Sequence, residues 1–548
     1  MVLDSSMPKK PFSGKAKKAQ LQAKRERKTG GGDGGGDGGG RNTSLLLMSK
    51  FKNDPDDAED DESEITGSSA AGVINSKANK YRLKFKSESK KEISRNRELA
   101  QQETRMISDM SAPSEMFFDS YHSFPRRQDW SEDWSKERLE RSENKYFREF
   151  VDNIMERAED EESGEEYSYF ELNLETWRQL WRVIEMSDVL LMILDVRYAT
   201  ATFPPSLYHH IVTEKQKHFI LVLNKCDLVQ PELSVAWKKY FQEKYPKLHV
   251  VFFTSFPSYN SMIMRRHGIK MKRLRANFRM AREGALQIQE ICQQLTQTDL
   301  SRWRDKINGV GHEDEDDTET VEDQRYITLG TIGHPNVGKS SLINSLLGKK
   351  QVSVSRTPGH TKHFQTIFIS KNVRLSDCPG LVFPSKVPKP LQVLMGSFPI
   401  SQVREPYSVV NFLAQRIDLP RILKLQMSAD QKIWSSFLIC NGWAEFRRFF
   451  TSRTSRPDSF RAANEIMRMA LEGKLCLSLQ PPNYNKLEFE SLQETEFVRT
   501  VLGDVGNEEI IDEEDEDKES GEESNESEDC DNDSKVVNTF AALDEDNE

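Results

Sequence analysis

Short apolar runs alternate with helix-compatible segments in the first half of the chain, and this alternation predicts a parallel sheet covered by helices on both faces. Three early runs have the length and composition of buried strands: residues 189–194, 219–223 and 250–253. Asp195, Asn224 and Thr254 follow these runs directly. Because ligands bind at the carboxyl ends of parallel strands, we expect these three residues to lie near a binding site.

Three later segments extend the same sheet: residues 326–332, 365–370 and 373–376. Amphipathic spacing predicts helices over residues 135–154 and 174–186, and the second helix places Trp177 and Trp181 four residues apart as core side chains. From about residue 393 to 479 the pattern is helical, with no further strands. The predicted fold class is α/β, with a mostly parallel sheet and a helical C-terminal domain.

The pattern divides the chain into six parts. In order, we predict a basic, disordered N-terminus with glycine-rich and acidic stretches (1–125), a first part of the α/β domain (126–310) with a basic insertion (265–282), an acidic linker (311–325), a second part of the α/β domain (326–392), a helical domain (393–490) and an acidic, disordered tail (491–548).

Composition supports long disordered flanks, because 36% hydrophobic and 30% charged residues are low and high values for a fully globular chain of 548 residues. The net charge of −11 is distributed very unevenly along the chain. Residues 9–28 carry nine basic side chains and one acid, whereas residues 508–533 carry sixteen acids and one lysine. Residues 9–28 either bind RNA or direct nuclear import, or they are a solvated tail. Residues 265–282, with eight basic residues and no acid, either contact RNA phosphates or form a solvated face.

Six scattered cysteines without a C-x-x-C pair argue against a zinc ribbon and against a secreted disulfide scaffold. No run of 18 apolar residues exists, and the N-terminus is too polar for a signal peptide. We therefore expect a soluble protein in a reducing compartment, without a membrane partner. We also expect a monomer that does not bind DNA.

Residues 333–340 read G-H-P-N-V-G-K-S and match the phosphate-binding pattern G-x-x-x-x-G-K-[ST] between a predicted strand and a predicted helix. Glycines let backbone N–H groups turn toward phosphate oxygens, and the following helix adds its positive end. Lys339 can reach the β- and γ-phosphates, and Ser340 can ligate Mg²⁺. A chance glycine turn before a helix is the alternative. The expected nucleotide contacts in this stretch are Gly333, Asn336, Val337, Gly338, Lys339, Ser340 and Ser341.

Residues 224–227, Asn-Lys-Cys-Asp, follow the second predicted strand and match the guanine-reading pattern N-K-x-D. The carboxylate of Asp227 can accept hydrogen bonds from the N1–H and the exocyclic amine of guanine, a pair that adenine cannot offer. Asn224 would hold the loop, and the stem of Lys225 would cover the base. Alone this four-residue match is weak, but beside a phosphate loop it predicts GTP and GDP as ligands.

Residues 377–380, Asp-Cys-Pro-Gly, follow the predicted strand 373–376 and match D-x-x-G. We expect Asp377 to hold Mg²⁺ through water and the Gly380 N–H to sense the γ-phosphate. The preceding loop, residues 356–361, can order over that phosphate. Thr361 is the first choice for a hydroxyl on Mg²⁺ and Thr357 the second, and either could instead be an ordinary turn residue.

Leu381 stands where Ras-type GTPases carry the glutamine that orients the attacking water. A leucine cannot hold a water molecule, so intrinsic hydrolysis should be slow, or another group must position the water.

The order of the motifs is unusual, because the guanine-reading pattern precedes the phosphate loop by more than 100 residues and follows it in Ras-like domains. The predicted strands can form a single sheet if the original ends of the domain are joined and new ends are opened elsewhere in the chain. Such a permutation is compatible with one core, because domain termini often lie close together. Over roughly residues 135–482 this order resembles the circularly permuted GTPases, the family of nucleostemin and the bacterial ribosome-assembly GTPases. The resemblance extends to residues 175–182, 353–361, 377–381 and 461–464 and to the acidic end.

The resemblance implies a circularly permuted Ras-like P-loop GTPase that acts as a nucleotide-controlled switch in ribosome biogenesis. It implies that the helical C-terminal region contacts ribosomal RNA or preribosomal particles, and that Asn336 helps to bind a K⁺ ion that stimulates hydrolysis. The predicted catalytic residues are therefore Lys339, Asn336 and Thr361. Residues 195–199 read D-V-R-Y-A where the family often has D-A-R-x-P, so the role of this segment stays open.

The basic N-terminus favours a nuclear or nucleolar location with passage through the cytoplasm, although the acidic tail offsets it. Two alternative functions remain. One is a nucleotide-binding scaffold without productive hydrolysis, which is consistent with Leu381. The other is an ATP-using P-loop protein in which the match at residues 224–227 is incidental.

Overall fold

The computed structural model describes residues 85, 88, 90–107, 117–118, 124–131, 133–159, 168–254, 268–308, 326–348, 351–355, 358–359, 364–370, 372–427, 433–452 and 454–484, with the backbone alone for residues 268–279. The predicted linker at 311–325 and the tail at 491–548 lie outside these residues. So do Thr357 and Thr361.

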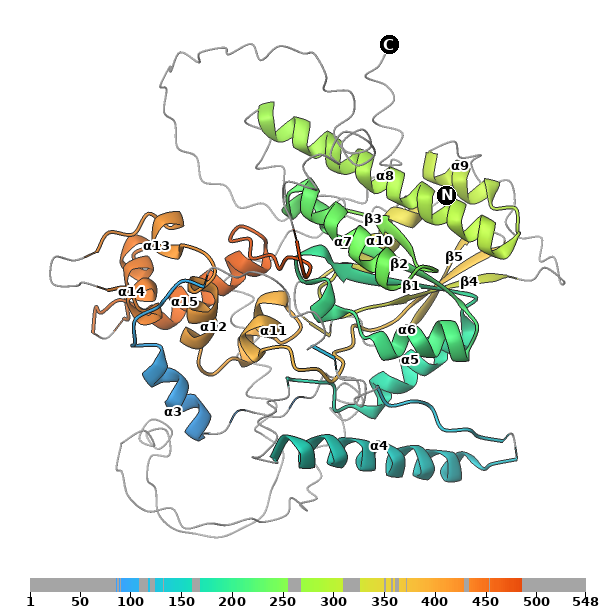
Figure 1. Cartoon of the computed structure of the whole chain (residues 1–548), viewed down its shortest axis with the longest axis horizontal. Coiled ribbons are helices and arrows are strands. Elements are labelled where there is room, and N and C mark those ends of the chain that lie inside the picture. Colours follow the sequence, from blue (N-terminus) through green and yellow to red (C-terminus); the bar gives the residue numbers. More distant parts are fainter. Residues whose placement is uncertain are drawn as a thin grey trace, which may run out of the picture. The chain divides into compact units, whose positions relative to one another are not determined.

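A six-stranded sheet with the strand order β3-β2-β1-β4-β6-β5 forms the centre of the fold (Figure 1). Neighbouring strands are parallel except for β5 and β6, which are antiparallel. The strands are β1 Val189–Asp195, β2 His218–Asn224, β3 His249–Phe252, β4 Ile327–Ile332, β5 Gln365–Ser370 and β6 Val373–Asp377. This sheet confirms the predicted α/β class with a mostly parallel sheet.

Strands β1 and β4 join the two halves of the chain, because they pair in parallel with Met192 opposite Ile332. The first three strands therefore lie on one side of this junction and the last three on the other. All seven residues of β1 are buried, as a strand covered on both faces requires, and this explains its unbroken apolar sequence. The arrangement brings the carboxyl ends of β1, β2 and β4 to one edge of the sheet.

Alternate residues of each strand face different layers of helices. In β1, Leu190 and Met192 belong to the core shared with α5 and α7, whereas Leu191 and Ile193 belong to the core shared with α8, α9 and α10. Figure 1 shows α5 and α8 on opposite sides of the strands. The covering helices are α5 Leu174–Met186, α6 Pro205–His209 with the π turn His210–Glu214, α7 Pro231–Lys244, α8 Gly268–Thr296, α9 Ser301–Asn308 and α10 Lys339–Leu347.

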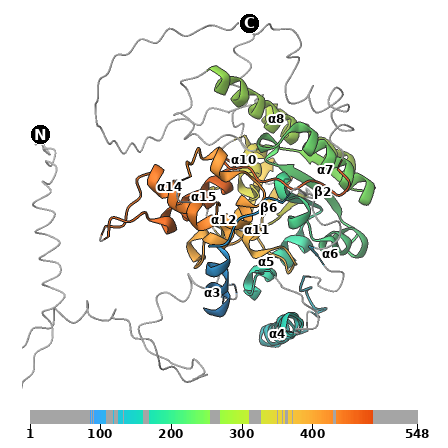
Figure 2. The same cartoon turned by 60° about the vertical axis from the view of Figure 1, so that its left-hand side comes forward.

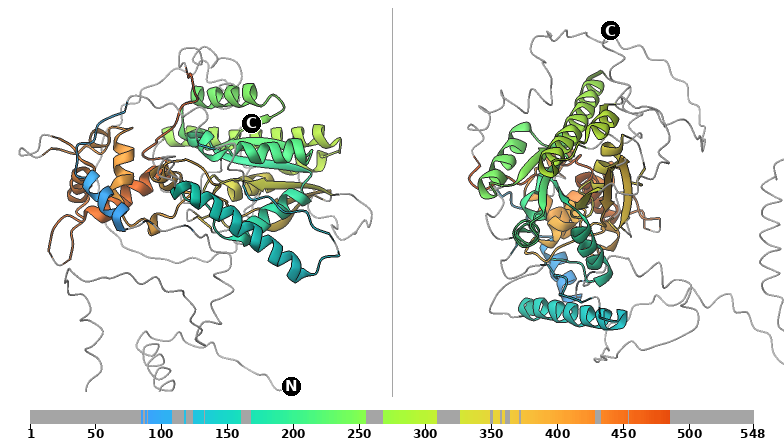
Figure 3. Two further views of the ribbon diagram at one scale, coloured as in Figure 1. Left: turned by 60° about the horizontal axis from the view of Figure 1, so that its bottom comes forward. Right: turned by 90° about the vertical axis from the view of Figure 1, so that its right-hand side faces the viewer.

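Helix α4, Lys136–Glu159, lies outside α5 on the far side of the sheet from α8 (Figure 3). Arg178 of α5 donates a 2.7 Å hydrogen bond from Nε to the carboxylate of Glu143 on α4. The buried ring of Phe147 adds an apolar contact to the same core.

The C-terminal region is helical, as predicted, and shares one continuous apolar core with α5 and α7. Its helices are α11 Lys389–Met395, α12 Tyr407–Ala414, α13 Leu419–Ile422, α14 Ser436–Phe446 and α15 Ser459–Leu471. Helix α3, Lys90–Leu99, lies beside α12 (Figure 2), within the stretch predicted to be disordered. The carbonyl of Ala100 accepts hydrogen bonds from the Phe437 N–H and the Ser436 hydroxyl, so this part of the N-terminal stretch is ordered by α14. No candidate membrane-spanning helix is found among the described residues.

Candidate nucleotide-binding site

The phosphate-binding pattern forms a tight loop between the end of β4 at Ile332 and the start of α10 at Lys339. A side chain at position 333 would place its Cβ 2.5 Å from the Ile193 carbonyl oxygen, so only glycine fits there. Gly338 has a φ of 100°, which glycine adopts without strain. The loop therefore leads into the N-terminus of α10, where backbone N–H groups and the helix dipole attract anions.

The side chain of Lys339 folds back over this loop. Its ammonium donates to the carbonyl oxygens of Gly333 at 3.0 Å and His334 at 2.7 Å. Only 7% of the residue is exposed, and this burial lowers the pKa of Lys339 to about 8 although the charge of Asp377 opposes the shift. A cation buried at a helix N-terminus, beside backbone amides, is suited to binding an anionic ligand.

Asp377 ends β6 and is completely buried. Its Oδ1 accepts a 3.4 Å hydrogen bond from the Thr331 hydroxyl, whereas its buried Oδ2 has no hydrogen-bond partner among the described residues. Burial raises the pKa of Asp377 to about 6, although the charge of Lys339 acts in the opposite direction. A buried carboxylate oxygen without a donor is suited to an external ligand such as a cation or its bound water.

The segment after Asp377 packs against the phosphate loop. The Leu381 N–H donates to the Gly333 carbonyl at 3.2 Å. A Cβ on Gly380 would lie 2.7 Å from the Cα of Pro335 and 3.1 Å from the ammonium of Lys339. The D-x-x-G glycine is therefore in close contact with the loop expected to hold the terminal phosphates.

The guanine-reading pattern follows β2 and contacts the phosphate loop directly. The side-chain amide of Asn224 donates a 2.6 Å hydrogen bond to the Val337 carbonyl, and its Oδ1 accepts from the Lys225 N–H at 2.7 Å. Lys225 has a φ of 64°, a left-handed conformation that is unfavourable for a residue with a side chain. The hydrogen bond from its N–H to Asn224 stabilises this turn.

Asp227 lies in the 3₁₀ turn Cys226–Leu228, where its Oδ1 accepts a 2.7 Å hydrogen bond from the Thr254 hydroxyl. Thr254 follows β3 and is buried. The sequence placed Thr254 near the binding edge, but its bond to Asp227 was not predicted, because no pattern links the two residues.

Two phosphate-loop side chains bond to the turn after α11, which sequence reasoning did not predict. The amide of Asn336 donates to the Gly396 carbonyl at 2.9 Å, and Nδ1 of His334 lies 3.2 Å from the Ser397 hydroxyl. Burial, with a smaller contribution from Lys339, lowers the pKa of His334 to about 3. Neither Gly396 nor Ser397 belongs to a recognisable motif, so only the three-dimensional structure identifies them.

The structure brings the predicted residues of the phosphate loop, the D-x-x-G segment and the guanine-reading turn to one edge of the sheet. Ser340 and Ser341, at the start of α10, are partly exposed there. Thr361 and Thr357, predicted to lie over the same edge, are outside the described residues. Within the part of the chain that the structure describes, no group of three His, Cys, Asp or Glu side chains forms a preformed metal site.

Several known proteins are similar in sequence to this chain. A family described as "50S ribosome-binding GTPase" matches residues 328–421. "Guanine nucleotide-binding protein-like 1" of Macaca fascicularis is 41% identical, and the human protein 40%, over 554 residues, which cover 91% of this chain and 90% of those proteins. "Large subunit GTPase 1" of Saccharomyces cerevisiae is 30% identical over 70% of this chain and 63% of that protein.

A solved structure, "Crystal structure of GNP-bound YlqF from T. maritima", aligns with 57% of this chain and all of that chain. Its sequence identity is 16% and its TM-score 0.34, so this similarity by itself says nothing about the fold.

Proposed function

The chain belongs to the family of guanine nucleotide-binding protein-like 1, and from this premise we propose that it is a GTP-controlled switch in ribosome assembly. The observation that carries the proposal is the hydrogen bond between Asn224 and the Val337 carbonyl. It joins the turn expected to read guanine to the loop expected to hold the phosphates. One nucleotide can therefore contact both.

In this proposal the phosphates lie at the N-terminus of α10, held by backbone N–H groups of the loop and by Lys339. Lys339 exchanges its two bonds to loop carbonyls for bonds to phosphate oxygens. The base lies beside Asp227, which Thr254 holds in place, and the stem of Lys225 covers one face of the ring. Gly380 is close enough to Lys339 to sense the γ-phosphate.

Mg²⁺ fits the residues present. The Ser340 hydroxyl and the Asp377 carboxylate are oxygen ligands of the kind Mg²⁺ prefers, and the second carboxylate oxygen of Asp377 is buried without a partner among the residues that the structure describes. Bound Mg²⁺ would neutralise charge on the phosphates. The amide nitrogen of Asn336 donates to the Gly396 carbonyl, and its amide oxygen is a ligand of the kind that suits K⁺. Thr361 completes the proposed Mg²⁺ set.

Hydrolysis in this proposal depends on positioning and charge stabilisation by Lys339, Asn336 and Thr361. Leu381 is 1% exposed and has no polar group to orient water. We therefore propose that hydrolysis is slow until a partner supplies or orders the missing group. A scaffold that binds GTP without productive hydrolysis is the second candidate, and Leu381 is the residue that favours it.

Ribosomal RNA, alone or in preribosomal particles, is the proposed partner. Three phenylalanines at the α14–α15 connection are exposed: Phe446 at 62%, Phe450 at 50% and Phe460 at 48%. Residues 446–461 contain five arginines and one acid. Exposed aromatic rings among cationic side chains suit stacked bases and phosphates. We propose that a monomer acts in the nucleus or nucleolus and passes through the cytoplasm.

Competition for labelled GDP tests the guanine claim. Unlabelled GTP should displace it and ATP should not, whereas equal displacement by ATP would favour the ATP-using alternative. Single-turnover phosphate release from GTP, with and without purified preribosomal particles, tests the switch. Stimulation by the particles is expected, and the absence of stimulation would favour the scaffold.

A further inference from the structure

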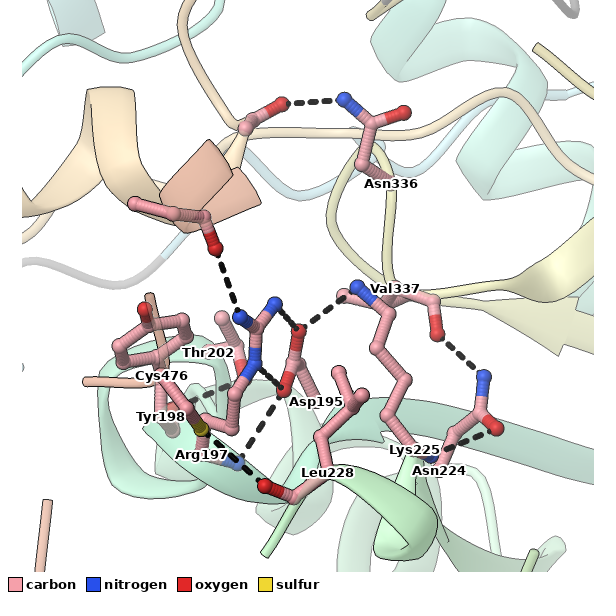
Figure 4. A network of polar contacts seen from close by, with 12 residues as sticks. Asp195, Arg197, Tyr198, Thr202, Asn224, Lys225, Leu228, Asn336, Val337 and Cys476 are labelled. Carbon is pink, nitrogen blue, oxygen red and sulfur yellow. Dashed lines mark hydrogen bonds and ion pairs between the residues drawn. The ribbon is translucent and has the colours of Figure 1, made fainter. Parts of the chain in front are cut away.

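A buried ion-pair group connects the guanine-reading turn to the last residue of β1 and to the segment that follows it (Figure 4). The carboxylate of Asp195 accepts a 2.7 Å hydrogen bond from the ammonium of Lys225. The same carboxylate accepts from Arg197 at 3.0 Å through Nε and at 2.8 Å through Nη2. Asp195 is 2% exposed and Arg197 is fully buried. Burial alone would raise the pKa of Asp195, but the charges of Arg197 and Lys225 outweigh it and hold this pKa well below the ordinary value.

Arg197 is also held from the side of the C-terminal helices. Its Nη1 donates a 3.0 Å hydrogen bond to the carbonyl of Ala470, in the last turn of α15. The Leu479 N–H donates a 2.8 Å hydrogen bond to the Arg197 carbonyl. The guanidinium therefore spans the distance between Asp195 and the end of α15, and the backbone of the same residue binds the chain that follows α15.

The segment 470–479 contacts the guanine-reading turn as well. The Cys476 thiol donates a 3.1 Å hydrogen bond to the carbonyl of Leu228, the residue after Asp227. Gly473 has a φ of 77°, and a Cβ there would lie 2.8 Å from Cδ1 of Leu228. Residues 470–479 therefore contact both the segment after β1 and the guanine-reading turn. They contribute none of the proposed nucleotide contacts.

A lysine side chain has several rotatable bonds, and holding it over a base carries an entropic cost unless another group fixes it first. We propose that Asp195 and Arg197 are positioning residues for guanine recognition, which hold Lys225 over the base, and that docking of residues 470–479 completes this arrangement. The inference rests on the guanine-reading role proposed above for residues 224–227. Since coupling is reciprocal, bound guanine nucleotide stabilises the docked segment and the docked segment strengthens nucleotide binding.

Hydrogen exchange on the full, unaltered chain tests the coupling without a mutation. Saturating GDP should slow exchange in peptides that cover residues 470–479, including the Leu479 amide, relative to the nucleotide-free chain. Saturating inorganic phosphate, which lacks the base, should leave these peptides unchanged. Equal exchange of residues 470–479 with and without GDP would overturn the proposal.

The variant Arg197→Lys keeps the positive charge but has a single ammonium, which cannot pair with both Asp195 oxygens and reach Ala470 at the same time. Its dissociation constant for GDP should rise about tenfold, within the range of ordinary coupling. Binding stoichiometry should stay unchanged, and the GDP-dependent protection of residues 470–479 should disappear. Arg178→Lys is the matched control, because Arg178 is also largely buried and ion-paired but does not contact these loops.

A purely structural role for Arg197 would lower the fraction of folded protein and leave the dissociation constant of the folded fraction unaltered. That result, or equal weakening in Arg197→Lys and Arg178→Lys, would contradict the proposal. If Arg197→Lys does not fold, the exchange experiment decides. A separate experiment tests the guanine-reading role itself. If ADP and GDP displace labelled GDP from the unaltered chain equally well, residues 224–227 do not select guanine.

Discussion

The side-chain amide of Asn224 donates a 2.6 Å hydrogen bond to the backbone carbonyl of Val337, although 113 residues separate the two positions. The bond is buried, and one lost hydrogen bond of this kind destabilises a protein by about 1–3 kcal/mol. It fixes the guanine-reading turn relative to the phosphate loop. Because β1 separates β2 from β4 in the sheet, the two loops are about two strand spacings apart, roughly 10 Å, which a nucleotide can span.

Exchanging Asp227 for asparagine should change which base is recognised. The new amide side chain would offer one donor and one acceptor, which match the carbonyl and the N–H of xanthine rather than the donor pair of guanine. We expect Asp227→Asn to weaken GDP binding by about 100-fold or more and to bind xanthosine diphosphate in its place. Competition against a labelled nucleotide measures this. The exposed Asp129→Asn is the control, and an unaltered preference for guanine would show that Asp227 does not read the base.

Removing the ammonium of Lys339 should abolish stabilisation by nucleotide. Wild-type protein at a GDP concentration of about 100 times the dissociation constant should gain about 2.7 kcal/mol in free energy of unfolding. Lys339→Met should gain almost nothing at that concentration, because its side chain offers no donor to phosphate. Thermal unfolding with and without GDP measures the gain. Lys145→Met, at an exposed lysine of α4, should respond like the wild type. An equal gain in Lys339→Met would exclude a phosphate contact by Lys339.

The nucleotide-free protein should lose stability in acid through His334. Burial, with Lys339 adding to it, lowers the pKa of His334 from 6.5 to about 3. Between these two values the unfolded chain binds more protons than the folded chain, so stability falls as the pH drops below 6.5. His334→Phe lacks this titration. From about pH 7.5 to about pH 5, the free energy of unfolding of the wild type should fall by about 2 kcal/mol relative to His334→Phe.

Urea unfolding of both proteins at the two pH values measures this difference. A difference in free energy of unfolding that is the same at both pH values can accompany the predicted pH-dependent difference, because the phenylalanine side chain cannot form the bond to Ser397. Parallel pH dependences would contradict the prediction.

A methyl group on Gly380 should disturb the phosphate loop. It would lie 2.7 Å from Cα and 2.8 Å from N of Pro335, and these backbone atoms cannot move without moving the loop. We expect Gly380→Ala to lower the free energy of unfolding by about 1–3 kcal/mol and to weaken GTP binding. Gly442→Ala is the matched control, because its nearest atom is 3.6 Å away and the residue lies inside α14. That control should be about 0.5–1 kcal/mol more stable than wild type. Equal stability of the two variants would show that the loop tolerates the methyl group.

Local patterns in the sequence predict the sheet and the main loops well. The unbroken apolar runs of β1 and β2 indicate buried parallel strands, and helices α4 and α5 follow from the spacing of their aromatic residues. The order of the guanine-reading and phosphate motifs predicts a permuted domain, because a single nucleotide must contact both motifs. The sheet order confirms this interpretation of the fold.

Long-range contacts have no such signature. The bond from Arg197 to the Ala470 carbonyl joins positions 273 residues apart, and its acceptor is a backbone atom that any residue would supply. The bond from Asn336 of the phosphate loop to the Gly396 carbonyl cannot be predicted from the sequence for the same reason, because its acceptor is also a backbone atom. The sequence predicts disorder for residues 90–107, whereas the structure shows a folded segment there. This polar, charged segment is stabilised by its contacts with α12 and α14, including those of the Ala100 carbonyl, and its own sequence pattern does not indicate them.

The most direct test is an experimental structure of the full chain with GDP and Mg²⁺. We predict one nucleotide, with its phosphates against Lys339 and the loop that follows β4, and its base with N1–H and exocyclic amine about 3 Å from the Asp227 carboxylate. A nucleotide whose phosphates occupy this loop while its base lies away from Asp227 would contradict the account.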